Sequence, residues 1–212
     1  TGNFSDVLAG WYAMKMGAPI SQLILATNEN DILARFFASG TYSIGQVRQT
    51  LSPSMDIQVA SNFERYLYYK LGCDGERMRS MMADFRKTGS LQVPTQPDIQ
   101  VDPAFVSMAA DTQQVLEAIG RYWNKYGYIL DPHTACGVVA AERLAPSSET
   151  SEPVFCLATA HPAKFPAAIE RATGRSDIAA HPAIRRLMDL PTRCVVLPND
   201  ENAVRELIEK TV

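Results

Sequence analysis

Residues 2–6 read Gly-Asn-Phe-Ser-Asp and stand directly before a predicted amphipathic helix. The first turn of a helix carries backbone N–H groups without partners and the positive end of the helix dipole, so it suits an anion such as phosphate. Gly2 allows close approach of the backbone to such a ligand. The turn is therefore a candidate phosphate site, although the pattern alone is more typical of an ordinary helix cap.

Two further loops carry polar side chains after predicted strands. Asn28 and Asn30 follow one apolar run, with Arg35 a helical turn later, and Thr159 and His161 follow another. Ligands of open α/β sheets bind at the carboxyl ends of strands. We expect Asn28, Asn30, Arg35 and His161 to lie near a ligand bound at this edge of the sheet. The alternatives are a helix cap at Asn30, a surface arginine and a structural turn histidine.

The cysteines and histidines do not indicate a metal site. The chain has 4 Cys and 3 His without the close grouping that tetrahedral zinc requires. Cys156 and Cys194 stand in apolar runs and are predicted to be small core residues, with reduced thiols. We expect His133 to be satisfied by the backbone at a helix start and His181 to be exposed.

The elements that must position these residues alternate between strand and helix patterns. Strands are predicted at residues 23–26, 56–60, 128–130, 154–158 and 193–197. Helices are predicted from residues 7, 32, 61 and 131, before residue 174 and around residues 204–208. Ser61 with Glu64 has capping-box spacing, and Asp131 with Pro132 reads as a helix start. This alternation predicts an α/β fold with a parallel-rich sheet flanked by helices.

Residues 74–127 differ from the rest of the chain, because they carry methionines and aromatics at helical spacing and no run as apolar as residues 23–26. They are predicted to be a largely helical insertion, with a Pro-rich loop near residues 94–103, inside one α/β domain spanning residues 1–212. The methionine and aromatic stripes are interpreted as core. Residues 146–151 are predicted to be a surface loop.

Composition excludes several classes of protein. The 212 residues have a net charge of −3 and 46% hydrophobic residues, without a basic block or an apolar run long enough to span a bilayer. We expect neither nucleic acid nor membrane as a partner, and a cytoplasmic location. The chain starts at Thr1 rather than Met, so we expect it to be part of a longer protein.

Several stretches resemble threonine synthase, a pyridoxal-phosphate enzyme of fold type II. They are Gly-Asn-Phe-Ser-Asp at 2–6, Thr-Asn-Glu-Asn-Asp at 27–31, Ser-Pro-Ser-Met-Asp at 52–56, Asp-Pro-His-Thr-Ala at 131–135 and Ala-His-Pro-Ala-Lys-Phe at 160–165. They follow the order found in the family and extend over most of the chain. The resemblance identifies the chain as the C-terminal portion of such an enzyme, the large α/β domain.

The resemblance implies the conversion of O-phospho-L-homoserine and water to L-threonine and phosphate by β,γ-replacement, a lyase reaction of threonine biosynthesis. Pyridoxal 5'-phosphate is the implied cofactor. By family match, Gly2, Asn3, Phe4 and Asp6 would surround its phosphate, and Thr159 would place a hydroxyl at the ring nitrogen. The candidates for binding the substrate are Asn28, Asn30 and Arg35, which would reach its phosphate, and His161, which would lie near the cofactor ring.

The family loop usually reads Gly-Asn-Phe-Gly-Asp, and Ser5 replaces its second glycine. If this position needs a positive φ, serine costs on the order of 1 kcal/mol, and Ser5→Gly would tighten cofactor binding.

The Schiff-base lysine of the family lies in a segment before this loop, as does a loop that grips the substrate. We therefore expect no catalytic residue in these 212 residues and no turnover by them alone. The N-terminal portion of the same enzyme is the expected partner, in a monomer or homodimer. A serine/threonine dehydratase is a weaker alternative. The others are a threonine-synthase-like phosphate-ester lyase and a non-catalytic protein that binds the cofactor or another ligand.

Overall fold

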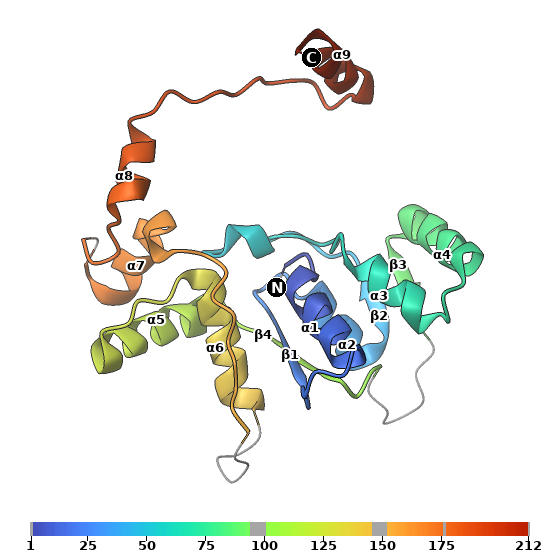
Figure 1. The fold of residues 1–212 in the computed structure, drawn as a ribbon, viewed down its shortest axis with the longest axis horizontal. Coiled ribbons are helices and arrows are strands. Elements are labelled where there is room, and N and C mark those ends of the chain that lie inside the picture. The colour runs from blue at the N-terminus through green and yellow to red at the C-terminus, as the bar shows by residue number, and fades with distance from the viewer. Residues whose placement is uncertain (1, 94–100, 146–151, 176, 212) are drawn as a thin grey trace. The chain divides into compact units, whose positions relative to one another are not determined.

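The computed structural model describes residues 2–93, 101–145, 152–175 and 177–211, and the chain divides between Ala180 and His181 into two compact units. Thr1, most of the predicted loop at 94–103 and the predicted loop at 146–151 lie outside the described residues. The second unit contains α8 (Pro182–Met188) and α9 (Glu201–Thr211) (Figure 1). In the described part of the chain, no helix is long and apolar enough to cross a bilayer.

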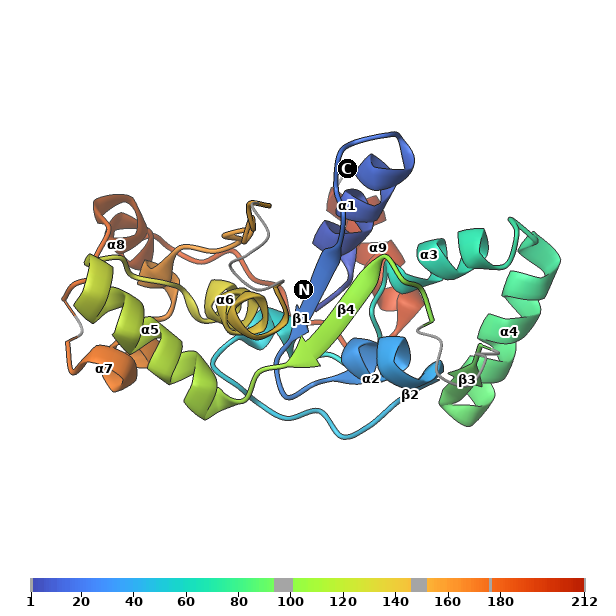
Figure 2. The same cartoon turned by 90° about the horizontal axis from the view of Figure 1, so that it is seen from below.

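A parallel strand pair lies at the centre of the first unit. β1 (Leu23–Thr27) pairs with β4 (Phe105–Ala109), with Leu23 opposite Phe105 and Thr27 opposite Ala109. The two strands run side by side in Figure 2. A second, antiparallel pair joins β2 (Thr41–Ser43) to β3 (Ser90–Gln92). The predicted α/β class with parallel pairing is confirmed.

Helices accompany these strands. In chain order they are α1 (Ser5–Lys15), α2 (Ile32–Ser39), α3 (Phe63–Lys70), α4 (Gly75–Thr88), α5 (Thr112–Tyr126), α6 (Pro132–Leu144) and α7 (Pro166–Thr173). Two 3-10 turns, η1 (Pro53–Met55) and η2 (Pro162–Lys164), interrupt the loops.

Residues 74–127 are largely helical, as α4 and α5 show, yet they also contain β4, the partner of β1. The sequence pattern does not predict this strand, because Ser107 interrupts its apolar run. The Ser107 hydroxyl donates to the carbonyl of Ala34, which removes the cost of placing it there. That these residues form an insertion stays a prediction.

Four predicted strands are wrong. Residues 56–60 and 128–130 are irregular, and residues 154–158 and 193–197 run without a strand partner among the described residues. Apolar runs become strands only where a neighbouring strand accepts their hydrogen bonds. The expectation that Cys156 and Cys194 are core residues is also wrong, because both are exposed.

Helix starts follow the sequence in part. Asp131 caps α6 and Pro132 is its first residue, as expected. The capping box predicted at Ser61 is wrong, because α3 begins after Asn62 without a side-chain cap. A capping box forms instead at Asp111, which opens α5.

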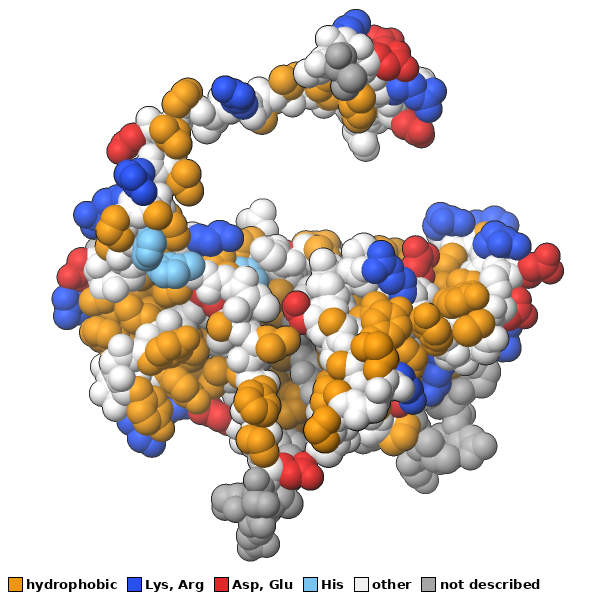
Figure 3. Space-filling view, in the orientation of Figure 1, with side chains coloured by type: hydrophobic (Ala, Val, Ile, Leu, Met, Phe, Trp, Pro, Cys, Tyr) orange, Lys and Arg blue, Asp and Glu red, His pale blue; other side chains and the backbone are white. Residues whose placement is uncertain are grey.

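The apolar interior of the first unit has two parts. One is rich in aromatic rings and gathers α1, α2 and α3 around Phe4, Phe36 and Tyr66. The other joins β1 to α5 and α6 through Ile119 and Val139. Hydrophobic side chains also show at the surface over α1 and α3 and over α5 and α6 (Figure 3).

Candidate functional site

The turn before α1 is fixed by Phe4. Phe4 has φ 68°, in the left-handed region, and its side chain is fully buried. Its ring packs against Phe37, Phe63 and Tyr66 at centroid distances of 5.9, 5.6 and 5.7 Å. A left-handed backbone costs a bulky residue about 1–2 kcal/mol, which this aromatic packing offsets.

A left-handed residue followed by a helix turns successive N–H groups toward one concave side. The Ser5 N–H donates to Asn3 Oδ1 at 3.0 Å, so a polar oxygen already occupies part of this concavity. The Asn3 carbonyl accepts from the backbone N–H of Asn62 at 3.2 Å, which holds the turn from outside. With the positive end of α1 behind it, this turn can bind an anion.

Ser5 is the first residue of α1 and is not among the described residues with positive φ. The premise that serine is strained at this position is therefore wrong, since Phe4 adopts the left-handed conformation instead.

Gly2 lies against the backbone of η1. A Cβ at Gly2 would stand 2.6 Å from the Ser54 carbonyl oxygen and 2.7 Å from Met55 Cα. Neither neighbour is the movable end of a side chain, so only glycine fits here. The turn and η1, which are some 50 residues apart in the chain, therefore form one structure.

Asn28 and Asn30 lie buried in a polar network around Asp56. Asp56 Oδ1 accepts from Asn28 Nδ2 at 2.7 Å, from Asn30 Nδ2 at 3.0 Å and from the Thr50 hydroxyl at 2.7 Å. Asn30 Oδ1 accepts from the Arg48 N–H at 2.8 Å. These bonds fix residues 48–56 beside the end of β1, and contact of Asn28 or Asn30 with a substrate stays a prediction.

Arg35 is half-exposed. Its Nε lies 2.8 Å from Asp31 Oδ1, and its Nη2 donates to the Ser43 carbonyl at 2.9 Å. The guanidinium is thereby aimed by two neighbours while part of it stays open to solvent. This geometry is compatible with the predicted contact to a phosphate and does not test it.

A histidine joins the start of α6 to η1. His133 Nε2 accepts from the Ser54 N–H at 3.3 Å, and its Nδ1 lies 3.0 Å from Asp131 Oδ1. The prediction that the backbone satisfies His133 holds for Nε2, whereas Nδ1 contacts the side chain of Asp131. The sequence pattern does not place His133 or Ser54 near the candidate site. No signal in the sequence pairs two residues 79 positions apart.

Asp131 is buried, which acts to raise the pKa of its carboxyl group. Hydrogen bonds from the side chains and backbone N–H groups of His133 and Thr134 outweigh this effect and lower the pKa below its ordinary value. Asp131 therefore remains ionised and keeps His133 in place.

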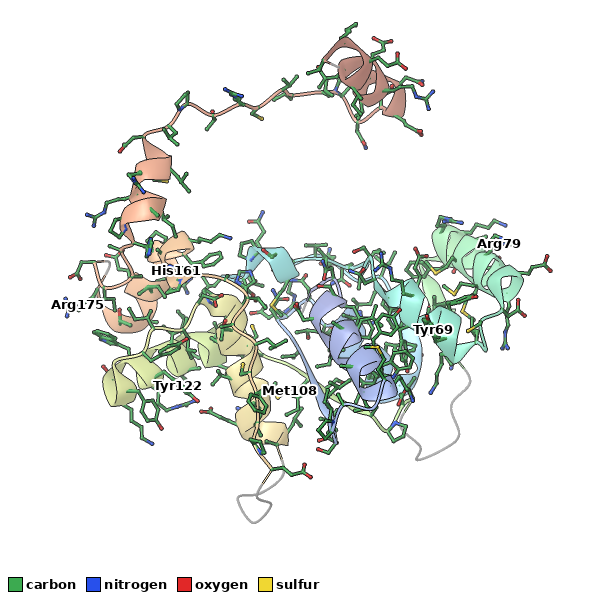
Figure 4. All side chains as sticks on the ribbon, viewed as in Figure 1. Tyr69, Arg79, Met108, Tyr122, His161 and Arg175 are labelled. Atoms are coloured by element: carbon green, nitrogen blue, oxygen red, sulfur yellow. The ribbon has the colours of Figure 1, made fainter. Side chains whose placement is uncertain are left out.

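Thr159 and His161 lie on the segment that enters η2. Thr159 is exposed, and His161 Nδ1 accepts from the Ala163 N–H at 3.1 Å, so His161 caps this turn (Figure 4). Phe165, just after η2, places its ring 4.8 Å from the His133 ring. The contacts thus join the Gly2 turn to η1, η1 to His133 and His133 to Phe165, whereas Thr159 has no hydrogen bond to these groups that would test its predicted role.

No cluster of His, Cys, Asp and Glu among the described residues could hold a metal ion. Burial raises the pKa of the Cys136 thiol to about 11, so this side chain, next to Ser52, is a protonated core residue at neutral pH.

Comparison with known proteins places these features in a family. The family model described as "Threonine synthase, C-terminal" matches residues 134–208. The chain is 42% identical to threonine synthase of Pseudomonas aeruginosa over 99% of this chain and 44% of that protein. It is 33% identical to human threonine synthase-like 2, over 99% of this chain and 43% of that protein.

Solved structures agree. PLP-bound threonine synthase from Brucella melitensis superposes with a TM-score of 0.85 at 40% identity, covering 99% of this chain and 44% of that one. Threonine synthase from yeast gives a TM-score of 0.85 at 38% identity, covering 99% and 46%. The chain thus spans less than half the length of these relatives.

Proposed function

The chain belongs to the threonine synthase family, and from this we propose that it is the C-terminal part of an enzyme that converts O-phospho-L-homoserine and water to L-threonine and phosphate. The observation that carries the proposal is the Gly2–Phe4 turn, which presents N–H groups at the start of α1 and is packed against η1. A likeness to threonine synthases over 99% of the chain supports it.

The proposed cofactor is pyridoxal 5'-phosphate, whose ring withdraws electrons from the substrate carbon atoms that lose protons. The residues present fit its phosphate. The turn offers a concave set of N–H groups, and Gly2 sits where a Cβ would collide with Ser54 and Met55. We assign Gly2, Asn3, Phe4 and Asp6 to the phosphate, with Phe4 acting through its backbone because its ring is buried.

Thr159 is proposed to hold the ring nitrogen through its hydroxyl. Its exposure leaves the side chain accessible to a ligand. A hydroxyl group at this position leaves the ring nitrogen less protonated than a carboxylate would, which moderates electron withdrawal and helps to select the reaction.

The residues proposed to bind or position the substrate are Asn28, Asn30, Arg35 and His161. Arg35 is the best placed of them to bind a phosphate, since it carries a fixed charge, is aimed by Asp31 and remains half-exposed. Asn28 and Asn30 would act by holding residues 48–56 in position, because their amide groups are bound to Asp56. His161 stands next to Thr159 along the same segment.

We assign no lysine of this chain to the covalent bond with the cofactor. Five lysines already have partners within the chain: Lys15 over Trp11, Lys70 at Asp102, Lys125 over Tyr126, Lys164 over Phe165 and Lys210 at Glu206. The remaining part of the family's length would supply the reactive lysine and part of the substrate site. The isolated 212 residues are then expected to be inactive.

The test uses the full-length protein, supplied with pyridoxal phosphate and O-phosphohomoserine. We expect phosphate and threonine to form in equal amounts, and this chain alone to form neither. Phosphate release without threonine would favour a phosphate-ester lyase, the second candidate. Cofactor binding without release of phosphate would indicate a binding protein.

A further inference from the structure

Residues 52–56, which include η1, lie against the turn at Gly2 and are called the wall of this turn. A Cβ at Gly2 would meet the Ser54 oxygen at 2.6 Å and Met55 Cα at 2.7 Å, so the two backbones are already in contact. Because no space separates the two backbones, a shift of Ser54 or Met55 toward the turn would displace Gly2 as well.

This wall is held from two sides. At its far end Asp56 accepts three side-chain hydrogen bonds, from Asn28, Asn30 and Thr50. On the α6 side, Met55 is buried within the second core cluster. The polar contacts on that side are the hydrogen bond from the Ser54 N–H to His133 Nε2, at 3.3 Å, and the longer contact of the Ser52 hydroxyl with Cys136 Sγ, at 4.0 Å.

His133 is itself fixed in one tautomer. Since Nε2 accepts from Ser54, Nδ1 carries the hydrogen and donates to Asp131 Oδ1 at 3.0 Å. The side chain is 6% exposed, and its ring lies 4.8 Å from that of Phe165. The ring is therefore a rigid acceptor aimed at the N–H of Ser54.

From this chain of contacts we propose that His133 is a positioning residue for the cofactor phosphate. It acts through the Ser54 backbone, which holds Gly2 and the N–H groups that follow. The proposal rests on the proposed function, since it takes the Gly2 turn as the phosphate site. His133 then contributes to the affinity for the phosphate group of the cofactor and not to the affinity for its pyridine ring.

Two substitutions separate the two hydrogen bonds of His133. The amide of His133→Asn overlaps Nδ1, so it can keep the contact with Asp131 but cannot reach Ser54. The amide oxygen of His133→Gln overlaps Nε2, so it can still accept from the Ser54 N–H. His181→Asn is the matched control, because this exposed histidine belongs to the second unit.

The measurement is the dissociation constant of the full-length protein for pyridoxal 5'-phosphate and for pyridoxal, which lacks the phosphate. We expect His133→Asn to weaken binding of the phosphorylated ligand by up to about tenfold, because the part-buried Ser54 N–H loses its acceptor, and to leave pyridoxal binding unchanged. The Gln variant and the His181→Asn control should both keep the wild-type ratio of the two constants.

The proposal would be overturned if His133→Asn weakened the binding of pyridoxal 5'-phosphate and of pyridoxal equally, or weakened the binding of neither. A folded His133→Gln variant that no longer prefers pyridoxal 5'-phosphate over pyridoxal would also overturn the proposal. This second result tests the proposal even if His133→Asn does not fold. If the wild-type protein binds neither ligand, or binds both equally, then it is the proposed function that fails.

Discussion

At the scale of single residues, Phe4 shapes the candidate site although its side chain turns away from it. Its left-handed backbone directs the following N–H groups outward, while its ring is buried against Phe37 and Phe63. One residue thus connects the stability of the core to the shape of an anion site. The residue with the strained backbone is Phe4 rather than Ser5. A substitution at Ser5 should therefore relieve no backbone strain.

Replacing Ser5 with glycine is expected to bring no gain in affinity. Ser5 is already helical, so glycine would only add chain entropy to the unfolded state, at a cost of up to about 1 kcal/mol. Cofactor titration and thermal unfolding of the full-length Ser5→Gly variant measure the two effects. Tighter cofactor binding would show that the ligand-bound turn differs from the turn seen in this structure.

Replacing Gly2 with alanine is expected to damage both stability and binding. The added Cβ would meet backbone atoms of Ser54 and Met55 at 2.6 and 2.7 Å, and overpacking of this kind costs about 1–3 kcal/mol. Unfolding in urea and cofactor titration would measure the loss. In the control Gly75→Ala, the new Cβ meets only Arg79 Nη1 at 3.8 Å, so that variant should retain full stability. Equal behaviour of the two variants would contradict the close packing at Gly2.

At the scale of elements, the start of α6 joins two parts of the candidate site. Its cap, Asp131, binds the N–H groups of His133 and Thr134 and also the Thr134 hydroxyl. The cap therefore sets the position of the His133 ring as well as the end of the helix.

Replacing Asp131 with asparagine should destabilise the protein by about 1–2 kcal/mol at neutral pH. Asparagine can still cap α6, but its neutral amide cannot make the charge-assisted bonds to His133 and Thr134. The native pKa of Asp131 is lowered, so its contribution is present above the unfolded pKa and is lost as pH falls through the native value. Denaturant unfolding from pH 7 to pH 2 should show the wild-type advantage shrinking in acid.

Asp111→Asn is the control, because this residue caps α5 with an exposed hydrogen bond. It should change stability less than Asp131→Asn does. An advantage of Asp131 that stays constant down to pH 2 would contradict the lowered pKa.

Sequence patterns anticipated some elements and failed at others for physical reasons. The apolar run at residues 23–26 is a strand because β4 lies beside it, whereas the equally apolar run at 154–158 has no strand partner among the described residues. The turn at Gly2 was found because its residues are adjacent in sequence. Ser54 and His133 were missed because their contact joins distant segments, and such contacts leave no local pattern.

At the scale of the whole molecule, the chain holds two compact units, and no large side chain is buried among the described residues of the second unit. Val195 and Val196, before α9, are 65% and 89% exposed, and Leu190 is 58% exposed. Within the family's full length, such apolar side chains would be candidates for contact with the remaining part of the protein.

Limited proteolysis of the 212-residue chain should cut first within residues 189–199. This segment is irregular and its residues are mostly exposed, so it fits a protease site readily. Mass spectrometry should then find a resistant fragment that contains α1 to α7. Early cleavage inside α5 or α6 would contradict the assignment of those helices to the core.

The central claim is that the turn from Gly2 to Asp6 binds the phosphate of pyridoxal phosphate. A crystal structure of the full-length protein with this cofactor tests it most directly. We predict phosphate oxygens at about 2.7–3.2 Å from backbone N–H groups of this turn, with the Ser54 N–H still bound to His133. A phosphate bound elsewhere, with this turn contacting only protein, would contradict the claim.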